Sequence, residues 1–177
     1  MLKTLNAPVT LVLGGARSGK SSHAESLCLA TGLTPIYVAT SQAYDQEMAV
    51  RVARHRADRD PLWTTVEEPL ALVDCLRAET AAGRIVLVEC LTLWLTNLMV
   101  ADQDVAAASE ELVAVLPSLA GPVVLVSNEV GQGVVPANAM ARAFVDHAGR
   151  LHQRIAAVAT TVTLVVAGLP LELKGQR

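Results

Sequence analysis

Aromatic residues are scarce in this chain, with two Trp, two Tyr and one Phe among 177 residues. The formal net charge is −3, so the sequence lacks both the stacking rings and the basic excess that are typical of nucleic-acid-binding proteins. Although 52% of the residues are hydrophobic, no stretch approaches the roughly 20 consecutive apolar residues that a membrane-spanning helix needs. These absences predict a soluble protein with a small-molecule substrate and no nucleic-acid partner.

Cysteine is also sparse, because Cys28, Cys75 and Cys90 are the only three and they form no CxxC pair. Their spacing supports neither a disulfide framework nor a zinc site, and it favours a reducing cytoplasm. An apolar stretch near the N-terminus resembles a signal peptide, but it leads directly into the most informative motif, so we interpret it as a strand. The length predicts a single domain spanning residues 1–177.

Short β-branched segments alternate with segments of helical periodicity, which is typical of βαβ units. Runs such as IVLV and VVLV predict strands buried on both faces, so the expected class is α/β, a mostly parallel sheet with helices on both faces. Strands are expected at 9–13, 35–39, 85–88, 123–126 and 161–166, with weaker candidates at 64–67 and 171–174. Helices are expected at 19–30, 46–58, 70–82, 109–116 and 139–159.

The segment GGARSGKS matches the phosphate-binding motif GxxxxGK[ST] at every fixed position, between a predicted strand and a predicted helix. Glycines let backbone N–H groups turn toward a phosphate, and the helix N-terminus adds partial positive charge. Lys20 is expected to reach the outer phosphates of ATP or GTP as a catalytic residue, and Ser21 to bind Mg²⁺. The motif makes the expected fold a three-layer sandwich of the P-loop NTPase type. A glycine-rich turn that binds nothing is the alternative. The nucleotide-binding residues predicted here are Gly14, Gly15, Ala16, Arg17, Ser18, Gly19, Lys20 and Ser21.

Glu89 directly follows the predicted strand at 85–88. An acidic side chain at the carboxyl edge of a parallel sheet can organise a metal ion or a water molecule near the phosphates. Glu89 is therefore the second candidate Mg²⁺ ligand. A solvated carboxylate at the end of a strand is the alternative interpretation.

Residues 45–59, DQEMAVRVARHRADR, place Arg51, His55 and Arg59 on one helix face at i+4 spacing. Neighbouring guanidinium groups disfavour protonation of His55, which leaves a neutral ring nitrogen able to attack phosphorus. A solvated basic face with an incidental histidine is the alternative. The other histidines, interpreted as structural, are His23, His147 and His152.

Four blocks occur in order along the chain: GGARSGKS, YVATSQAYDQEMAVRVARHRADR, VLVECLTLWLTNL and VLVSNEVGQGVVPANAMARAFVDHAGRLHQRIA. Together they resemble the bifunctional adenosylcobinamide kinase/adenosylcobinamide-phosphate guanylyltransferases of cobalamin biosynthesis. ATSQ followed by DxEM and RHR, and NEVGxGxVP, are more specific than the phosphate motif. The resemblance implies a homo-oligomer that phosphorylates the hydroxyl of the cobinamide aminopropanol arm. It then joins GMP from GTP to that phosphate through a guanylylated histidine.

The same resemblance implies roles for residues outside the phosphate loop. His55 is the implied nucleophile, and Arg54 stands where some relatives carry a second histidine. The chain departs from the family pattern at Val145 and His152. The further nucleotide contacts that the resemblance implies are Thr40, Ser41, Gln42, Arg56, Ala57, Asp58, Arg59, Glu67 and Glu89.

A single-activity kinase and a GTP-binding regulatory protein are the alternatives to this function. A single-activity P-loop small-molecule kinase would explain the phosphate motif, but not the ATSQ and RHR blocks. A GTP-binding regulatory protein would normally carry a guanine-reading NKxD block, and SNEV at 127–130 has the Asn but lacks the Lys and the Asp. The preference for guanine therefore rests on the resemblance.

Overall fold

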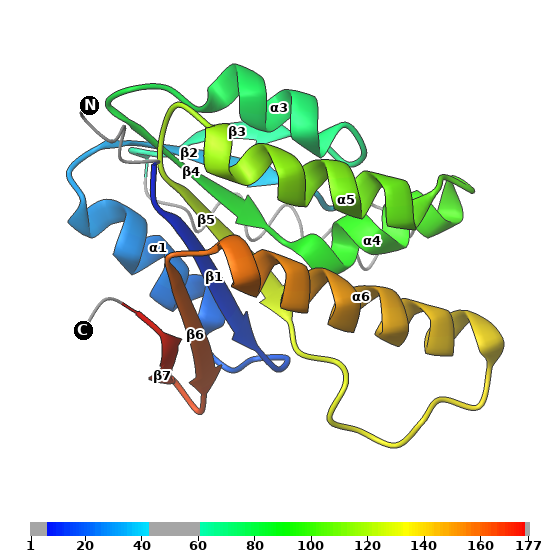
Figure 1. Ribbon diagram of the computed structural model, residues 1–177. Coiled ribbons are helices and arrows are strands. Elements are labelled where there is room, and N and C mark those ends of the chain that lie inside the picture. The colour runs from blue at the N-terminus through cyan, green and yellow to red at the C-terminus, as the bar shows by residue number, and fades with distance from the viewer. Residues whose placement is uncertain (1–6, 43–60, 176–177) are drawn as a thin grey trace.

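Residues 7–42 and 61–175 are described by the computed structural model, which Figure 1 shows. Its strands are β1 (Val9–Gly14), β2 (Thr34–Ala39), β3 (Thr64–Glu67), β4 (Arg84–Glu89), β5 (Val123–Asn128), β6 (Thr161–Val166) and β7 (Leu169–Lys174). They form one sheet in the order β3-β2-β4-β5-β1-β6-β7. Neighbouring strands are parallel, except that β6 and β7 are antiparallel. The predicted α/β class with a mostly parallel sheet is confirmed.

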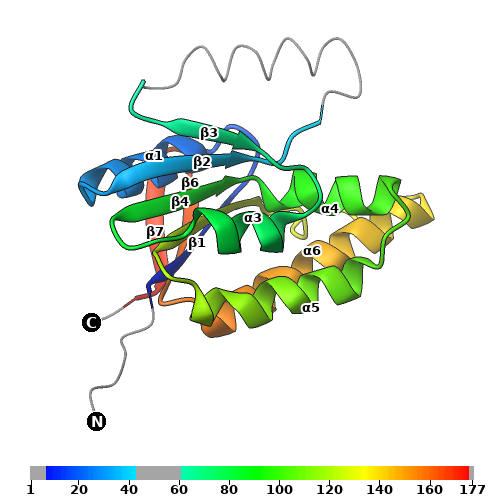
Figure 2. The same cartoon turned by 90° about the horizontal axis from the view of Figure 1, so that it is seen from above.

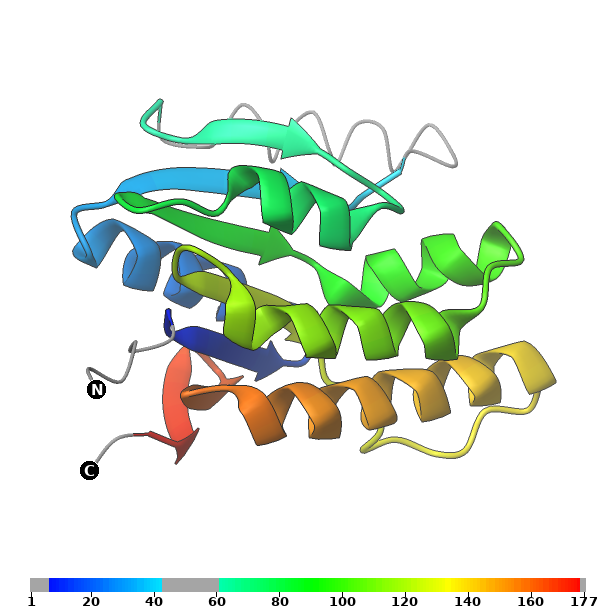
Figure 3. The ribbon, with the colours of Figure 1, turned by 45° about the horizontal axis from the view of Figure 1, so that its top comes forward.

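Helices cover both faces of this sheet, as predicted. They are α1 (Lys20–Ala30), α3 (Leu72–Glu79), α4 (Leu91–Val100), α5 (Val105–Val115) and α6 (Ala139–Val158), with a short 3₁₀ helix η1 (Leu116–Ser118). Figure 2 and Figure 3 show α3, α5 and α6 together on one face, whereas α1 lies on the other. The predicted helix at 46–58 lies outside the described residues.

Alternate side chains of the central strands enter two separate apolar clusters. In β1, Leu11 and Leu13 belong to the cluster beneath α3, α4, α5 and α6, whereas Val12 packs with Ala24 and Cys28 of α1. Leu11 and Val12 are both fully buried. The uninterrupted apolar runs of the sequence therefore reflect burial on both faces of the sheet.

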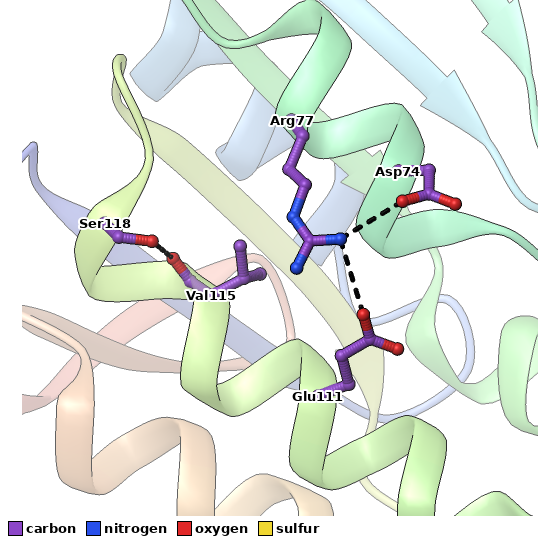
Figure 4. A network of polar contacts seen from close by, with 5 residues as sticks. All are labelled: Asp74, Arg77, Glu111, Val115 and Ser118. Atoms are coloured by element: carbon purple, nitrogen blue, oxygen red, sulfur yellow. Dashed lines mark hydrogen bonds and ion pairs between the residues drawn. The ribbon is translucent and has the colours of Figure 1, made fainter.

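An exposed polar network links α3 to α5 on the outer surface, as Figure 4 shows. Nη1 of Arg77 lies 3.1 Å from Oδ1 of Asp74 and 3.4 Å from Oε1 of Glu111. Where α5 ends, the Ser118 hydroxyl donates to the Val115 carbonyl oxygen at 2.8 Å. Exposed ion pairs contribute little stability, so the apolar cluster beneath these helices holds them on the sheet.

Helix α4 was not predicted from the sequence. Its residues, LTLWLTNLMV, are mostly apolar, and even Thr92 and Asn97 are buried beside Leu91, Trp94, Leu95 and Leu98. Because the segment has no polar face, the 3.6-residue alternation that identifies a surface helix is missing. No helix in the described part of the chain is both long and apolar enough to cross a membrane.

Parallel pairing brings the carboxyl ends of six strands, β1 to β6, to one edge of the sheet. Ala39 of β2 is in register with Glu67 of β3 and with Glu89 of β4. Gly14, at the end of β1, is in register with Asn128 of β5. Polar residues that are far apart in the sequence therefore meet beside the glycine-rich segment, where α/β proteins bind their ligands.

Candidate active site

Two glycines at the ends of the loop between β1 and α1 lie close to the backbone of the β6–β7 region. Gly19 has a φ of 92°, in the left-handed region, and a Cβ added there would lie 3.2 Å from the Gly168 Cα. A Cβ added to Gly14 would lie 2.7 Å from the Val165 carbonyl oxygen. Close backbone approach therefore favours glycine at both positions, and the left-handed conformation favours it at Gly19 as well.

The turn between β6 and β7 supports this loop from the side. The Gly168 N–H donates to the Ser18 carbonyl oxygen at 2.8 Å. Ala167 and Gly168 both have positive φ, 53° and 78°, as in the tight turns that connect antiparallel strands. No pattern in the sequence predicts this contact, because it joins residues 150 positions apart in the chain.

Two side chains of the loop are suited to an anionic ligand. Lys20 is only 8% exposed, and its Nζ lies 3.4 Å from the Gly15 carbonyl oxygen. The Ser18 hydroxyl oxygen is buried with no hydrogen-bond partner among the described residues. A buried cation and a buried unsatisfied hydroxyl are costly, and a bound phosphate would satisfy both.

Ser21 and Glu89, the two predicted Mg²⁺ ligands, are brought together by the fold. The Ser21 hydroxyl donates to Oε1 of Glu89 at 3.0 Å. Hydroxyl and carboxylate oxygens suit Mg²⁺, which is usually held by one or two protein groups together with phosphate and water. No cluster of three or more His, Cys, Asp or Glu that could hold a metal occurs in residues 7–42 and 61–175. The arrangement therefore fits a metal shared with a nucleotide better than a metal held by protein ligands alone.

Thr40 is fully buried beside the cis peptide bond between Glu89 and Cys90. Its Oγ1 accepts from the Cys90 N–H at 2.9 Å and lies 2.8 Å from the Cys90 carbonyl oxygen. The Asn97 amide donates to the Thr40 carbonyl oxygen at 2.7 Å. These contacts make Thr40 a support for the end of β4, and its contact with a nucleotide stays a prediction.

The remaining predicted residues are placed as follows. Ser41 and Gln42 are half-buried just beyond Thr40, and Glu67 is exposed at the end of β3. Ser41, Gln42 and Glu67 therefore stand at the same edge as Glu89. His55 lies outside the described residues, and so do the predicted nucleotide contacts Arg56, Ala57, Asp58 and Arg59.

The sequence interpretation missed a polar cluster at the ends of β4 and β5. The Asn128 side-chain amide donates to Oγ1 of Thr92 at 2.9 Å and approaches Sγ of Cys90 at 3.8 Å. Oγ1 of Thr92 and Sγ of Cys90 lie 2.9 Å from each other. Burial, and secondarily the charge of Glu89, raises the pKa of the Cys90 thiol, so Cys90 stays protonated. The sequence does contain one indication of this cluster, namely the polar Asn128 at the end of the apolar strand VLVSN.

His152 is buried on α6, and its Nε2 lies 2.7 Å from Oγ of Ser127. Burial lowers the pKa of His152, and the carboxylate of Glu129 opposes that shift. The contact ties α6 to β5, which agrees with the structural interpretation of this histidine. His147 is half-buried on the same helix.

An open groove of about 730 Å³ lies on the α1 face, toward the amino ends of β1, β5 and β6. His23 and Leu27 of α1 line one side, and Pro170 and Glu172 of β7 the other. The groove is thus separate from the carboxyl edge that carries the phosphate loop. The chemistry of the loop, not the size of the groove, identifies the active site.

Comparison with known proteins finds similarity along almost the whole chain. A family model described as "Cobinamide kinase / cobinamide phosphate guanyltransferase" matches residues 10–173. The bifunctional adenosylcobalamin biosynthesis protein CobP of Pseudomonas aeruginosa is 54% identical over 168 residues, covering 94% of this chain and 97% of that protein. The corresponding protein CobU of Escherichia coli is 41% identical over 179 residues, covering 93% and 98%.

Solved structures share the fold at low sequence identity. The flagellar accessory protein FlaH of Methanocaldococcus jannaschii superposes with a TM-score of 0.53 at 12% identity, covering 97% of this chain and 80% of that one. The P4 protein of bacteriophage phi6, solved in complex with ADP, gives 0.53 at 17% identity, covering 93% and 54%. These neighbours support the P-loop NTPase type of α/β fold.

Proposed function

The chain belongs to the cobinamide kinase/cobinamide phosphate guanylyltransferase family, and we propose that both activities use the phosphate loop and the carboxyl edge beside it. The protein is a bifunctional enzyme of adenosylcobalamin biosynthesis. The contact between Ser21 and Glu89 at 3.0 Å carries the proposal for the site, because it joins the start of α1 to the end of β4, where a nucleotide-bound metal is expected.

In the kinase step, the loop binds the triphosphate of ATP or GTP. Backbone N–H groups and the N-terminus of α1 hold the phosphate oxygens, and Lys20 pairs with the outer phosphates. Ser21 and Glu89 would hold Mg²⁺, which neutralises negative charge on the phosphates when it is bound. The cobinamide hydroxyl then attacks the γ-phosphorus, and the nucleoside diphosphate leaves.

In the guanylyltransferase step, His55 is the proposed nucleophile. A neutral ring nitrogen attacks the α-phosphorus of GTP, pyrophosphate leaves, and the covalent histidyl–GMP is transferred to cobinamide phosphate. Because one product leaves before the second substrate reacts, ping-pong kinetics are expected. The further nucleotide contacts of this proposal are Thr40, Ser41, Gln42, Arg56, Ala57, Asp58, Arg59 and Glu67.

The cellular setting belongs to the same proposal. We place the enzyme in the cytoplasm, because its three cysteines are free and a reducing compartment suits such thiols. One domain spanning residues 1–177 would carry both reactions, and copies of the chain would form a homo-oligomer. Size-exclusion chromatography with light scattering tests the oligomer, since a monomer at micromolar concentration would contradict it.

Labelled nucleotide tests the proposal directly. The protein is incubated with GTP carrying label at the α-phosphate, with and without Mg²⁺, and then denatured in alkali, where a phosphoramidate survives. We expect alkali-stable, acid-labile label on His55, and its release as product when cobinamide phosphate is added. Phosphorylation of cobinamide without any covalent label would instead indicate a single-activity kinase, and binding of GTP without turnover would indicate a regulatory protein.

A further inference from the structure

Asn128 stands at the point of the carboxyl edge where an outermost phosphate is expected. It ends β5, the strand between β4 and β1. Glu89 ends the strand on one side, and Gly14, in register with Asn128, ends the strand on the other. The Glu129 N–H also donates to the Gly14 carbonyl oxygen at 3.0 Å. The half-buried Asn128 side chain therefore lies between the proposed metal ligand and the start of the phosphate loop.

In the structure, the amide nitrogen of this side chain faces the start of α4. Nδ2 donates to Oγ1 of Thr92 and approaches Sγ of Cys90, and both residues follow β4 at the start of α4. A side-chain amide is planar and carries its nitrogen and oxygen on opposite branches. Holding Nδ2 toward Thr92 turns Oδ1 away from β4, so the group presented at the edge is a hydrogen-bond acceptor.

An acceptor at this point suits a particular partner. Phosphate oxygens are mostly ionised at neutral pH and act mainly as hydrogen-bond acceptors, so they are poor partners for Oδ1, whereas an incoming hydroxyl group can donate to it. We propose that Asn128 accepts a hydrogen bond from the hydroxyl of the kinase substrate and orients its oxygen for attack on the γ-phosphorus. This role rests on the proposed function of the phosphate loop, and it adds a residue that contacts the substrate.

Asn128 does not act as a general base in this phosphoryl transfer. The hydroxyl oxygen forms a bond to the γ-phosphorus, the bond from that phosphorus to the β-bridging oxygen breaks, and its electron pair leaves with the nucleoside diphosphate. The hydroxyl proton passes to water or to a phosphate oxygen, because an amide oxygen is too weakly basic to keep it. Asn128 contributes orientation only, which in general is sensitive to displacements of about 1 Å.

Two substitutions separate an acceptor from a donor at this position. Asn128→Ala removes the acceptor and is expected to lower kcat for cobinamide phosphorylation by about 10- to 100-fold. Asn128→Asp keeps an acceptor oxygen, so its kcat should lie well above that of the Ala variant. Its KM for the nucleotide should rise, because a carboxylate is added near the phosphates. If kcat for Asn128→Asp is equal to or lower than kcat for Asn128→Ala, Nδ2 contacts the phosphate instead and the proposal is wrong.

Covalent labelling with α-labelled GTP is the second readout. Attack on the α-phosphorus needs no substrate hydroxyl, so Asn128→Ala should label to the wild-type extent. Equal losses of labelling and phosphorylation would overturn the proposal, because they would show a general defect of binding or folding. Asp104→Ala is the control for stability, since its carboxylate caps α5 by accepting from the Ala107 N–H at 2.9 Å, outside the proposed site.

Lys20→Ala distinguishes failure of this inference from failure of the proposed function. If Lys20→Ala abolishes phosphorylation while Asn128→Ala leaves kcat unchanged, only the role of Asn128 is wrong. If Lys20→Ala is fully active, the phosphate loop is not the site and the proposed function is wrong as well.

Discussion

Lys20 is the only Lys, Arg, Asp or Glu side chain that is buried among the described residues. A buried ammonium group is costly unless it is paired, and the position of Lys20 therefore supports the proposed binding of phosphate. We expect Lys20→Ala to lower both activities by about 10²- to 10³-fold, the usual effect of removing a group that stabilises transition-state charge. Steady-state assays of each reaction measure this loss.

Lys174→Ala is the matched control for Lys20→Ala. Lys174 is an exposed lysine whose Nζ donates to the carbonyl oxygens of Ala156 and Ala157 at 2.8 and 3.1 Å, so both activities should be unchanged. Full guanylylation by Lys20→Ala would show that a second nucleotide site serves the α-phosphorus reaction.

The carboxylate of Glu89 can be neutralised with little change of shape. Glu89→Gln should keep a contact with Ser21 but lose the charge that favours a divalent cation, so the Mg²⁺ concentration for half-maximal turnover should rise. Titration of both activities with Mg²⁺ measures the shift. Glu79→Gln, which removes an exposed pair with Arg84 at 3.4 Å, is the control, and an unchanged Mg²⁺ midpoint for Glu89→Gln would leave Glu89 as a strand-end carboxylate only.

At the level of elements, His152 of α6, which is buried against Ser127 of β5, makes the free energy of unfolding depend on pH. Burial lowers the pKa of His152 in the folded state, while the unfolded value is about 6.5. Below that pH the unfolded chain binds a proton that the folded chain excludes, so the free energy of unfolding falls as the pH falls. One such proton contributes at most about 1.4 kcal/mol per pH unit.

Urea unfolding at pH 7.5 and pH 5.5 measures this dependence. His152→Gln keeps a polar side chain that can bond to Ser127 but cannot titrate, so its stability should fall less over the same interval. Identical pH dependence in the two proteins would assign the effect to other groups.

The sequence predicted elements where local pattern and burial agree. All seven strands were expected, because runs such as VVLV at the start of β5 are buried on both faces, and the phosphate loop was recognised because its residues are contiguous. Helix α4 was missed because packing, not amphipathic periodicity, specifies it. Asn128 and Gly168 were missed because their roles depend on strand order and on the β6–β7 turn, which join residues far apart in the chain.

At the level of the whole molecule, the order of the strands brings Ser21 and Glu89 together. The loop after β1 and the end of β4 are separated by β5, yet Ser21 reaches Glu89 across that strand. The end of β2, from which the chain continues into the histidine-containing block, lies directly beside β4. The proposed function would therefore use one edge of the sheet for attack on two different phosphorus atoms of a nucleotide.

This arrangement predicts that the two activities can be separated by one substitution. His55→Ala should abolish covalent GMP and guanylyl transfer while cobinamide phosphorylation stays measurable. Only attack on the α-phosphorus needs a nucleophile from the protein, whereas the kinase step uses the substrate hydroxyl and the phosphate loop. The sequence predicts a polar helix face for His55, so truncation should change stability by no more than about 0.5 kcal/mol, as is usual for surface sites.

His55→Asn is the companion variant, because it keeps polarity but offers no ring nitrogen to phosphorus. Circular dichroism and nucleotide binding are compared first, so that a loss of label cannot be attributed to unfolding. Each variant then receives α-labelled GTP, and the label that survives alkaline precipitation is counted. Wild-type labelling in either variant would place the nucleophile elsewhere. His23 and His147 would then be tested before His152, whose ring is buried and already bonded to Ser127.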